Sequence, residues 1–215
     1  MPLFRLWKED AATFGIWQVT ESNLQLRRSL TASLPYDEEL SHYRAACRQT
    51  EYLAVRVLLR TLLGEEKQIG HLDSGKPYLC DGSWRISISH TKGYVAVALH
   101  PAAEVGIDIE QVHERVRGVA THFVRSDELP GFSFLSPSDQ LYALLLHWSA
   151  KETIFKVLGC SNVDFREHLR IFPFPLAAEG DFRAQEYRTP SRQQFQVSYL
   201  LHPHFVCTTA LAIAR

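Results

Sequence analysis

The sequence lacks several features that define particular classes of protein, beginning with closely spaced cysteines. Its four cysteines are Cys47, Cys80, Cys160 and Cys207, and no two of them form a Cys-x-x-Cys pair. This spacing fits neither a zinc knuckle nor a dense disulfide scaffold, and it is typical of reduced cysteines in a cytosolic protein. We therefore expect a cytoplasmic location.

Long hydrophobic runs and an excess of one charge are also missing. No segment has the apolar length that a membrane span needs. The first ten residues carry charges at Arg5, Lys8, Glu9 and Asp10 without the apolar centre of a signal peptide. Lys and Arg number 23 against 24 Asp and Glu, a formal net charge of −1, which removes the electrostatic footprint of a general nucleic-acid binder. We expect neither a membrane nor a nucleic acid as partner.

The composition does provide enough material for a folded core. Hydrophobic residues make up 46% of the 215 positions, and this length suits one large domain or two small lobes. Apolar periodicity and turn residues predict a strand or hairpin in residues 1–20 and a series of later elements. The predicted helices cover 37–63, 119–124 and 138–158, and the predicted strands cover 84–89, 94–99, 105–109, 169–172, 194–201 and 205–213.

The two halves share a plan in which a helix is followed by antiparallel strands. This predicts an α+β fold of two pseudo-symmetric lobes, each a helix packed on an antiparallel sheet, with the boundary near 101–104. We assign residues 1–103 to an N-terminal lobe and 104–215 to a C-terminal lobe. Because ligand pockets prefer domain interfaces, we expect the active site between the lobes. The internal pseudo-symmetry favours a monomer.

Two short segments carry the pattern that points to chemistry. In Gly106-Ile107-Asp108-Ile109-Glu110 the apolar residues alternate with polar ones, so a strand there places Asp108 and Glu110 on one face. In the helix predicted for 138–158, Trp148, Glu152 and Lys156 are four residues apart and form one stripe.

If that strand and that helix pack together, three carboxylates and a lysine converge. Such an all-oxygen environment is what Mg²⁺ prefers, with open positions for water and a substrate phosphate. Each segment alone also has an ordinary explanation, because two acids on a strand or a Lys-Glu pair in a helix are common on solvated faces. The two together favour the metal interpretation, since acids on a core strand need a partner.

Upstream of these segments, further motifs occur in a fixed order. They are Glu51-Tyr52-Leu53-Ala54-Val55-Arg56 in the first predicted helix, the turn Gly75-Lys76-Pro77-Tyr78, and the strand end Ser87-Ile88-Ser89-His90-Thr91. A segment from Phe123 to Glu128 lies between the acidic strand and the long helix. On spacing alone a histidine at the end of a strand, such as His90, is more often a surface or core residue than a ligand.

Taken together, these motifs resemble the 4′-phosphopantetheinyl transferases, in particular the larger two-lobed kind named after the surfactin-synthetase activator. The resemblance covers roughly residues 48–159. It implies an enzyme, a magnesium-dependent holo-[acyl-carrier-protein] synthase, that transfers 4′-phosphopantetheine from coenzyme A to a serine of an apo acyl or peptidyl carrier protein, giving 3′,5′-ADP. The pathway that the resemblance implies is fatty acid or secondary metabolite biosynthesis.

The resemblance also implies roles for individual residues. Asp108, Glu110 and Glu152 match the ligands of Mg²⁺, for which Mn²⁺ is an alternative, and Glu128 matches a position near that site. Lys156 matches the helix lysine beside the reacting phosphate. The positions that match contacts to coenzyme A are Arg56, Lys76, Ser89 and His90, together with the second basic residue of the helix motif, Lys151.

The expected chemistry agrees with these roles. Attack of a serine hydroxyl on a diphosphate places charge on phosphate oxygens, so catalysis rests on positioning and on neutralisation by a metal and a cation such as Lys156. The hydroxyl must also lose its proton, directly or through water, to a base. Glu152 suits this role, but metal coordination lowers the basicity of a carboxylate. We therefore assign Glu152 as both candidate base and candidate ligand.

Two other functions compete with the transferase. A metal-dependent nuclease that uses Asp and Glu-x-Lys is disfavoured, because Val112 stands where the lysine would be and the chain lacks a basic excess. A non-catalytic module that binds coenzyme A or a carrier protein would be expected to lack a carboxylate or the lysine, and all are present. The loop containing Phe132 and Phe134 is either an apolar patch for a carrier-protein helix or a segment tucked on the core.

Overall fold

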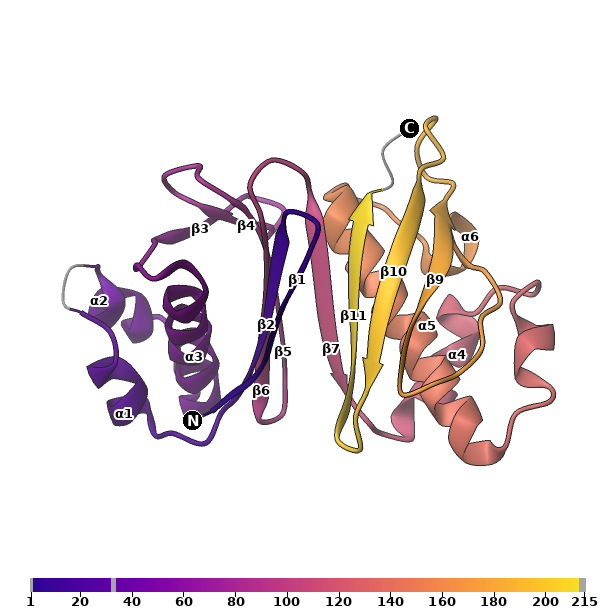
Figure 1. Ribbon diagram of the computed structural model, residues 1–215, viewed down its shortest axis with the longest axis horizontal. Coiled ribbons are helices and arrows are strands. Elements are labelled where there is room, and N and C mark those ends of the chain that lie inside the picture. Colours follow the sequence, from indigo (N-terminus) through magenta and orange to yellow (C-terminus); the bar gives the residue numbers. More distant parts are fainter. Residues whose placement is uncertain (1, 32–33, 213–215) are drawn as a thin grey trace. The chain divides into compact units, whose positions relative to one another are not determined.

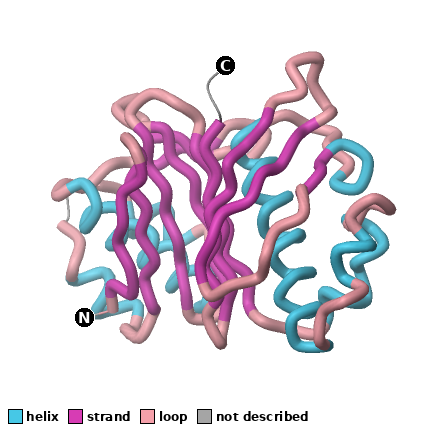
Figure 2. Tube along the Cα trace, turned by 45° about the vertical axis from the view of Figure 1, so that its right-hand side comes forward, coloured by secondary structure: helices cyan, strands magenta, loops and turns pink. Residues whose placement is uncertain are grey.

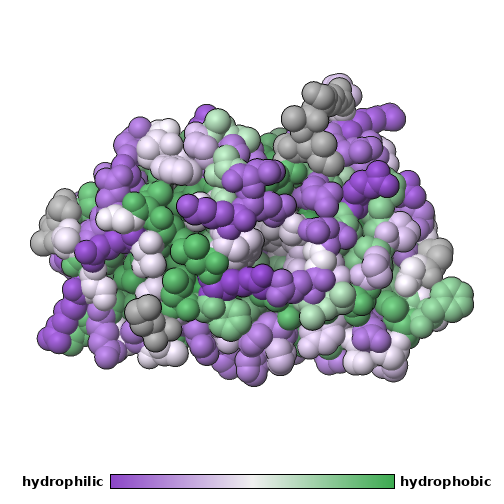
Figure 3. All heavy atoms as spheres, viewed as in Figure 1, coloured by the Kyte–Doolittle hydropathy of each residue, from purple (hydrophilic) through white to green (hydrophobic). Residues whose placement is uncertain are grey.

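A computed structural model describes residues 2–31 and 34–212. The chain divides into two compact units, Met1–Ala102 and Ala103–Arg215 (Figure 1). Each unit has an antiparallel sheet with helices packed on it, which confirms the predicted α+β class. None of the described helices is long and apolar enough to cross a membrane. On the face viewed in Figure 3, hydrophilic and hydrophobic residues are interspersed.

The first unit is a four-stranded sheet in the order β1-β2-β6-β5 with a long helix, α3, packed on it. The predicted hairpin in residues 1–20 is confirmed by the pairing of β1 with β2. The strands and helices stand out from the loops in Figure 2. The elements are β1 Leu3–Glu9, β2 Ala12–Gln18, α1 Asn23–Arg28, α2 Tyr36–Ser41, α3 Ala46–Leu63, β3 Ile69–His71, β4 Pro77–Leu79, β5 Arg85–Thr91 and β6 Tyr94–His100.

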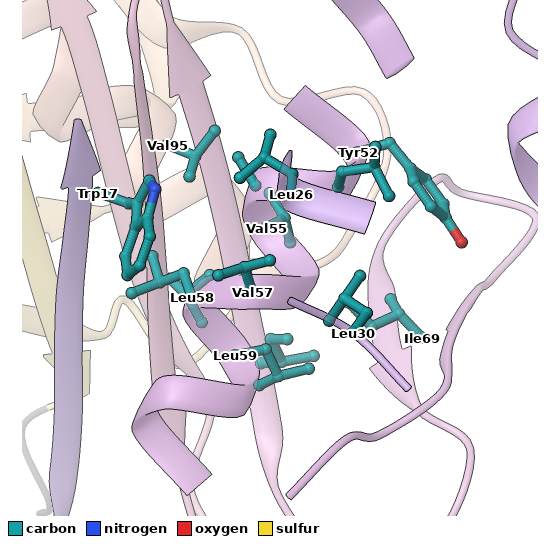
Figure 4. Packing of buried hydrophobic residues seen from close by; sticks show 14 of the residues in the cluster. Trp17, Leu26, Leu30, Tyr52, Val55, Val57, Leu58, Leu59, Ile69 and Val95 are labelled. Carbon is teal, nitrogen blue, oxygen red and sulfur yellow. The ribbon is translucent and has the colours of Figure 1, made fainter. Parts of the chain in front are cut away.

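Helix α3 supplies more buried residues to the first core than any other single element. Its buried Leu58 and Leu59 pack with Trp17 of β2 and Val95 of β6 (Figure 4). The leucines of α3 come close to β2 at Gly15, where a Cβ would lie 2.9 Å from a methyl group of Leu58.

The prediction of one continuous helix over 37–63 is wrong in its first part. It is divided into α2 and α3 by residues 42–45, which are not helical. Tyr43 in this break contacts Tyr52 of α3, with 5.5 Å between the ring centroids. The predicted end is confirmed: α3 closes at Gly64, whose φ of +78° is the left-handed conformation that glycine adopts readily.

The second unit is a five-stranded sheet in the order β7-β11-β10-β9-β8, crossed by the helix α5. The helix predicted for 119–124 begins earlier, at Arg115, and β9 has no counterpart among the predicted strands. The predicted last strand extends to Ile213, which lies outside the described residues. The elements are β7 Val105–Gln111, α4 Arg115–Phe123, the 3₁₀ helix η1 Leu129–Phe132, α5 Pro137–Leu158, α6 Phe165–His168, β8 Leu169–Ile171, β9 Glu179–Glu186, β10 Gln194–Leu201 and β11 Phe205–Ala212.

The two units share a common core topology. In each, the strand before the long helix pairs with the last strand of the unit, which pairs in turn with the strand before it: β2-β6-β5 in the first and β7-β11-β10 in the second. The predicted pseudo-symmetry of the two halves is therefore confirmed. The predicted site between the lobes stays a prediction.

Candidate active site

Strand β7 carries two acids toward helix α5. Its residues alternate, so Gly106, Asp108 and Glu110 share one face, while Ile107 and Ile109 are buried on the other. Gly106 explains how closely the helix approaches, because a Cβ there would lie 2.5 Å from the main-chain oxygen of Thr153. The glycine of this motif thus makes room for the helix that bears the other site residues.

Buried hydroxyl groups fix the helix on the sheet. Thr208 of β11 lies opposite Asp108 in the strand register. Its Oγ1 is 2.9 Å from Oγ of Ser149 and 2.7 Å from Oγ1 of Thr153, both on α5. All three hydroxyls are buried, and such hydrogen-bonded groups restrict how α5 can slide over the strands.

Two contacts join the stripe on α5 to the acids of β7. The Nζ of Lys156 donates to Oδ1 of Asp108 at 2.8 Å and to the main-chain oxygen of Ile107 at 3.0 Å. The Nε1 of Trp148 donates to Oε1 of Glu110 at 2.8 Å. Glu152 lies between Trp148 and Lys156 on the helix. The structure therefore brings together the three predicted carboxylates and the predicted lysine.

The carboxylates influence one another electrostatically. Burial raises the pKa of Glu152 to about 7; the charges of Asp108 and Glu110 add to the rise, and Lys156 opposes it. Burial and the charge of Asp108 also raise the pKa of Glu110, against the hydrogen bond from Trp148. A cation placed among these acids would relieve the repulsion between them.

The side chains suit a hard divalent cation by their chemistry, since the three acids provide only oxygen donors. In residues 2–31 and 34–212, however, no three His, Cys, Asp or Glu side chains are arranged to hold one ion. The Lys156 ammonium lies against Asp108, where it balances that charge. This contact engages Oδ1 of Asp108, and a bound cation would compete with the ammonium for the charge of this carboxylate.

Lys151, which the resemblance assigns to coenzyme A, lies elsewhere. Its side chain is 0% exposed, and its Nζ donates to Oε2 of Glu128 at 2.9 Å and to the main-chain oxygens of Phe123 at 2.6 Å and Phe165 at 3.2 Å. Burial lowers the pKa of Lys151, and the charge of Glu128 opposes this. All three N–H groups have acceptors inside the protein, so we do not retain Lys151 as a coenzyme A contact.

Glu128, assigned by the resemblance to the neighbourhood of the metal, is the partner of this lysine. Its Oε2 also accepts from the main-chain N–H of Arg125 at 2.8 Å, and its Oε1 accepts from that of Ile171 at 2.7 Å. Both carboxylate oxygens are therefore occupied by donors of the chain. The pair ties α5 to the segment after α4 and to β8.

The first unit contains a cavity of about 380 Å³ beside helix α3. Arg48 and His90 meet at its wall: Nη1 of Arg48 is 3.0 Å from Nε2 of His90 and 2.9 Å from Oε2 of Glu51. A guanidinium can only donate, so Nε2 of His90 is the acceptor in this contact. The lining residues are Tyr43, Arg48, Glu51, Tyr52, Val55, Arg56, His71, Gly75, Pro77, Ile88 and His90.

Of the predicted coenzyme A residues, Arg56 and His90 line this cavity. Arg56 is held by Glu39, 3.2 Å away, and lies over the ring of Tyr52 at 3.5 Å from its centroid. Lys76 belongs to the same turn as two lining residues, its neighbours in sequence. Ser89 precedes His90 on β5, so its side chain points to the opposite face of the sheet.

Sequence reasoning missed several lining residues. Arg48 is the most relevant: the sequence shows it as one of the basic residues before Arg56 without assigning it to coenzyme A, yet it adds a second guanidinium to the cavity wall beside that of Arg56. A signal for it existed, since Arg48, Glu51, Tyr52 and Val55 follow the spacing of one helix face. His71 had no such signal; burial and the charge of Arg56 lower its pKa.

Comparison with known proteins places these features in a family. The model of the 4′-phosphopantetheinyl transferase superfamily matches residues 104–210. The chain is 30% identical over 137 residues to "4′-phosphopantetheinyl transferase AcpT" of Salmonella typhimurium, covering 62% of this chain and 71% of that protein. The protein of the same name from Salmonella typhi gives the same values.

A mammalian protein is also similar. The chain is 29% identical over 128 residues to the "L-aminoadipate-semialdehyde dehydrogenase-phosphopantetheinyl transferase" of Mus musculus, covering 50% of this chain and 41% of that protein. These relatives are named as phosphopantetheinyl transferases, and they match the chain that carries the site described above. The chain belongs to the 4′-phosphopantetheinyl transferase superfamily, whose members transfer phosphopantetheine to carrier proteins.

Proposed function

We propose that this chain transfers 4′-phosphopantetheine from coenzyme A to a serine of an apo acyl or peptidyl carrier protein and releases 3′,5′-ADP. The observation that carries the proposal is the convergence of Asp108, Glu110, Glu152 and Lys156 where β7 meets α5. A non-catalytic module has no need for three mutually repelling acids with a lysine beside them.

Asp108, Glu110 and Glu152 are the proposed ligands of Mg²⁺, or of Mn²⁺ in its place. When bound, the metal would neutralise charge on the diphosphate of coenzyme A and help to orient it. Lys156, whose side chain is 26% exposed, is then the cation available to a phosphate oxygen once it leaves Asp108. This division of charge suits phosphoryl transfer, in which positioning and electrostatic stabilisation supply most of the acceleration.

Glu152 is the proposed acceptor of the serine proton. The pKa of its uncoordinated carboxylate, raised to about 7 by burial, suits a general base near neutral pH, whereas coordination to the metal would lower this pKa. In the proposed step the serine oxygen forms a bond to the phosphorus that carries pantetheine. The bond from that phosphorus to the bridging oxygen of 3′,5′-ADP breaks, and the serine proton goes to Glu152.

The cavity beside α3 is the proposed place for the nucleotide part of coenzyme A. Arg48 and Arg56 supply fixed positive charge, and His90 lies within hydrogen-bonding distance of Arg48. A phosphate monoester is a strong acceptor for such donors, and it would replace Glu51 as the partner of Arg48. Lys76 remains a proposed contact of the nucleotide, whereas Ser89, whose side chain points to the opposite face of the sheet, is not retained in this role. A cytoplasmic, monomeric state is part of the same proposal.

The test is intact-protein mass spectrometry of an apo acyl carrier protein incubated with this chain, coenzyme A and Mg²⁺. We expect the carrier mass to rise by one phosphopantetheine arm, and we expect EDTA or the substitution Asp108→Ala to prevent this. Binding of coenzyme A without any mass shift on several carriers would instead support the binding module. A mass shift that persists in both EDTA and the Asp108→Ala variant would refute the metal-site assignment.

A further inference from the structure

The indole of Trp148 is directed at the acid cluster. It lies one helical turn before Glu152 on α5, and its Nε1–H donates to Oε1 of Glu110 at 2.8 Å. An indole nitrogen can only donate, and a carboxylate oxygen can only accept, so the direction of this hydrogen bond is fixed. The bond engages one of the two carboxylate oxygens of Glu110, and the other would then be the metal ligand.

The ring of Trp148 is itself held in place. Its centroid is 5.3 Å from that of Phe123, with an interplanar angle of 67°, and 5.6 Å from that of Phe165, with an angle of 50°. The main-chain oxygens of these same two phenylalanines accept hydrogen bonds from the buried ammonium of Lys151. Lys151 therefore fixes the two residues that flank the indole.

These contacts form a continuous support from the core to the acids. Glu128 forms an ion pair with Lys151, and Lys151 donates hydrogen bonds to the main-chain oxygens of Phe123 and Phe165. The rings of these two phenylalanines pack against Trp148. A side chain immobilised by packing loses little further freedom when it makes a hydrogen bond, so the indole can constrain the carboxylate beyond it.

We infer that Trp148 is a positioning residue that orients Glu110 as a metal ligand, by engaging one carboxylate oxygen and presenting the other toward Asp108 and Glu152. The inference rests on the proposed metal site. It assigns Trp148 no contact with coenzyme A or with the carrier protein. Partners that orient ligands in this way typically change metal affinity by about ten- to a hundredfold when they are removed.

The experiment measures binding of Mn²⁺ to the full chain in the presence of coenzyme A, by the loss of the electron paramagnetic resonance signal of free Mn²⁺. Trp148→Phe keeps an aromatic ring between the two phenylalanines and removes the N–H. We expect its Mn²⁺ affinity to fall by about ten- to a hundredfold. Trp84→Phe, at the edge of the first core, is the matched control and should bind as the parent does.

A second substitution guards against a packing effect. Incorporation of the benzothiophene analogue of tryptophan at position 148 keeps the fused ring and replaces only the N–H by sulfur. It should weaken Mn²⁺ binding as Trp148→Phe does. In addition, Mn²⁺ should alter the tryptophan emission of the parent and of Trp84→Phe, and this change should be lost in Trp148→Phe.

The outcomes separate this inference from the proposed function. If the parent binds no Mn²⁺, or if Asp108→Ala binds it equally well, the metal site itself is refuted. If Asp108→Ala abolishes binding while the benzothiophene analogue binds Mn²⁺ within about threefold of the parent, the metal site stands and the role of the Trp148 N–H is refuted.

Discussion

Gly106 offers the sharpest test of how the site is assembled. A Cβ at this position would lie 2.5 Å from the main-chain oxygen of Thr153, 2.7 Å from a methyl of Val157 and 2.9 Å from a methyl of Thr153. Gly106 is paired with Ala210 on β11, so the strand cannot easily retreat. In Gly106→Ala, α5 must therefore move away from β7 by roughly 1 Å to restore van der Waals distances.

This displacement has two measurable consequences. Forcing a methyl group into a packed contact costs about 1–3 kcal/mol, which should appear in the free energy of unfolding by denaturant. The shift also separates Lys156 and Glu152 from the acids of β7. Because a misplacement of about 1 Å lowers catalytic rates by roughly a hundredfold, transfer to a carrier protein should fall by a similar factor.

Gly118 provides the matched control, since it lies inside α4 and a Cβ there would meet nothing within 4 Å. Gly118→Ala should raise stability by about 0.4–1 kcal/mol, because alanine favours helix and restricts the unfolded chain. Transfer should be unchanged in this variant. Unchanged stability and unchanged transfer in Gly106→Ala would refute the reasoning, because the helix would then not be held against the strand by this contact.

Two further predictions concern buried ionisable groups. Lys151→Met should lower the free energy of unfolding by about 3–5 kcal/mol, since it leaves Glu128 charged and buried. Lys67→Met, which breaks surface ion pairs with Asp81 and Glu65, should cost much less. Equal losses in the two variants would contradict the burial of the first pair. Burial lowers the pKa of His147 to about 4, whereas in the unfolded chain it is about 6.5. Between these pH values the unfolded chain therefore binds more protons than the folded protein does. The free energy of unfolding should fall by about 3 kcal/mol as the pH drops from 6.5 to 4. Denaturant unfolding at several pH values should show a shallower dependence in His147→Leu, and the same slope in both proteins would refute the assignment.

The acid cluster could be predicted from the sequence because it depends on two regular repeats, that of a strand and that of a helix. Alternation along a strand places Asp108 and Glu110 together, and a helical repeat aligns Trp148 with Glu152 and Lys156. The contact between strand and helix could be expected, but neither period establishes it, since it depends on Gly106 and on how α5 lies across the sheet.

The role of Lys151 could not be predicted in the same way. It is the immediate neighbour of Glu152, yet the helical turn points it to the core, where its three acceptors come from residues 14 to 28 positions away. Strand β9 was missed for a different reason. Few of its residues are apolar, and its place in the sheet is set by its partners β8 and β10.

The pairing of β7 with β11 has a consequence for the order of events during synthesis. Asp108 pairs with Thr208, which is synthesised a hundred residues later. Strand β7 therefore lacks its partner strand until most of the second unit has been synthesised. The first unit has all its strands by His100 and can complete its sheet earlier. Until β11 arrives, the edge of β7 offers unpaired main-chain groups to other chains. A transcript truncated before β11 should therefore give a protein whose first half is folded and whose acidic strand aggregates.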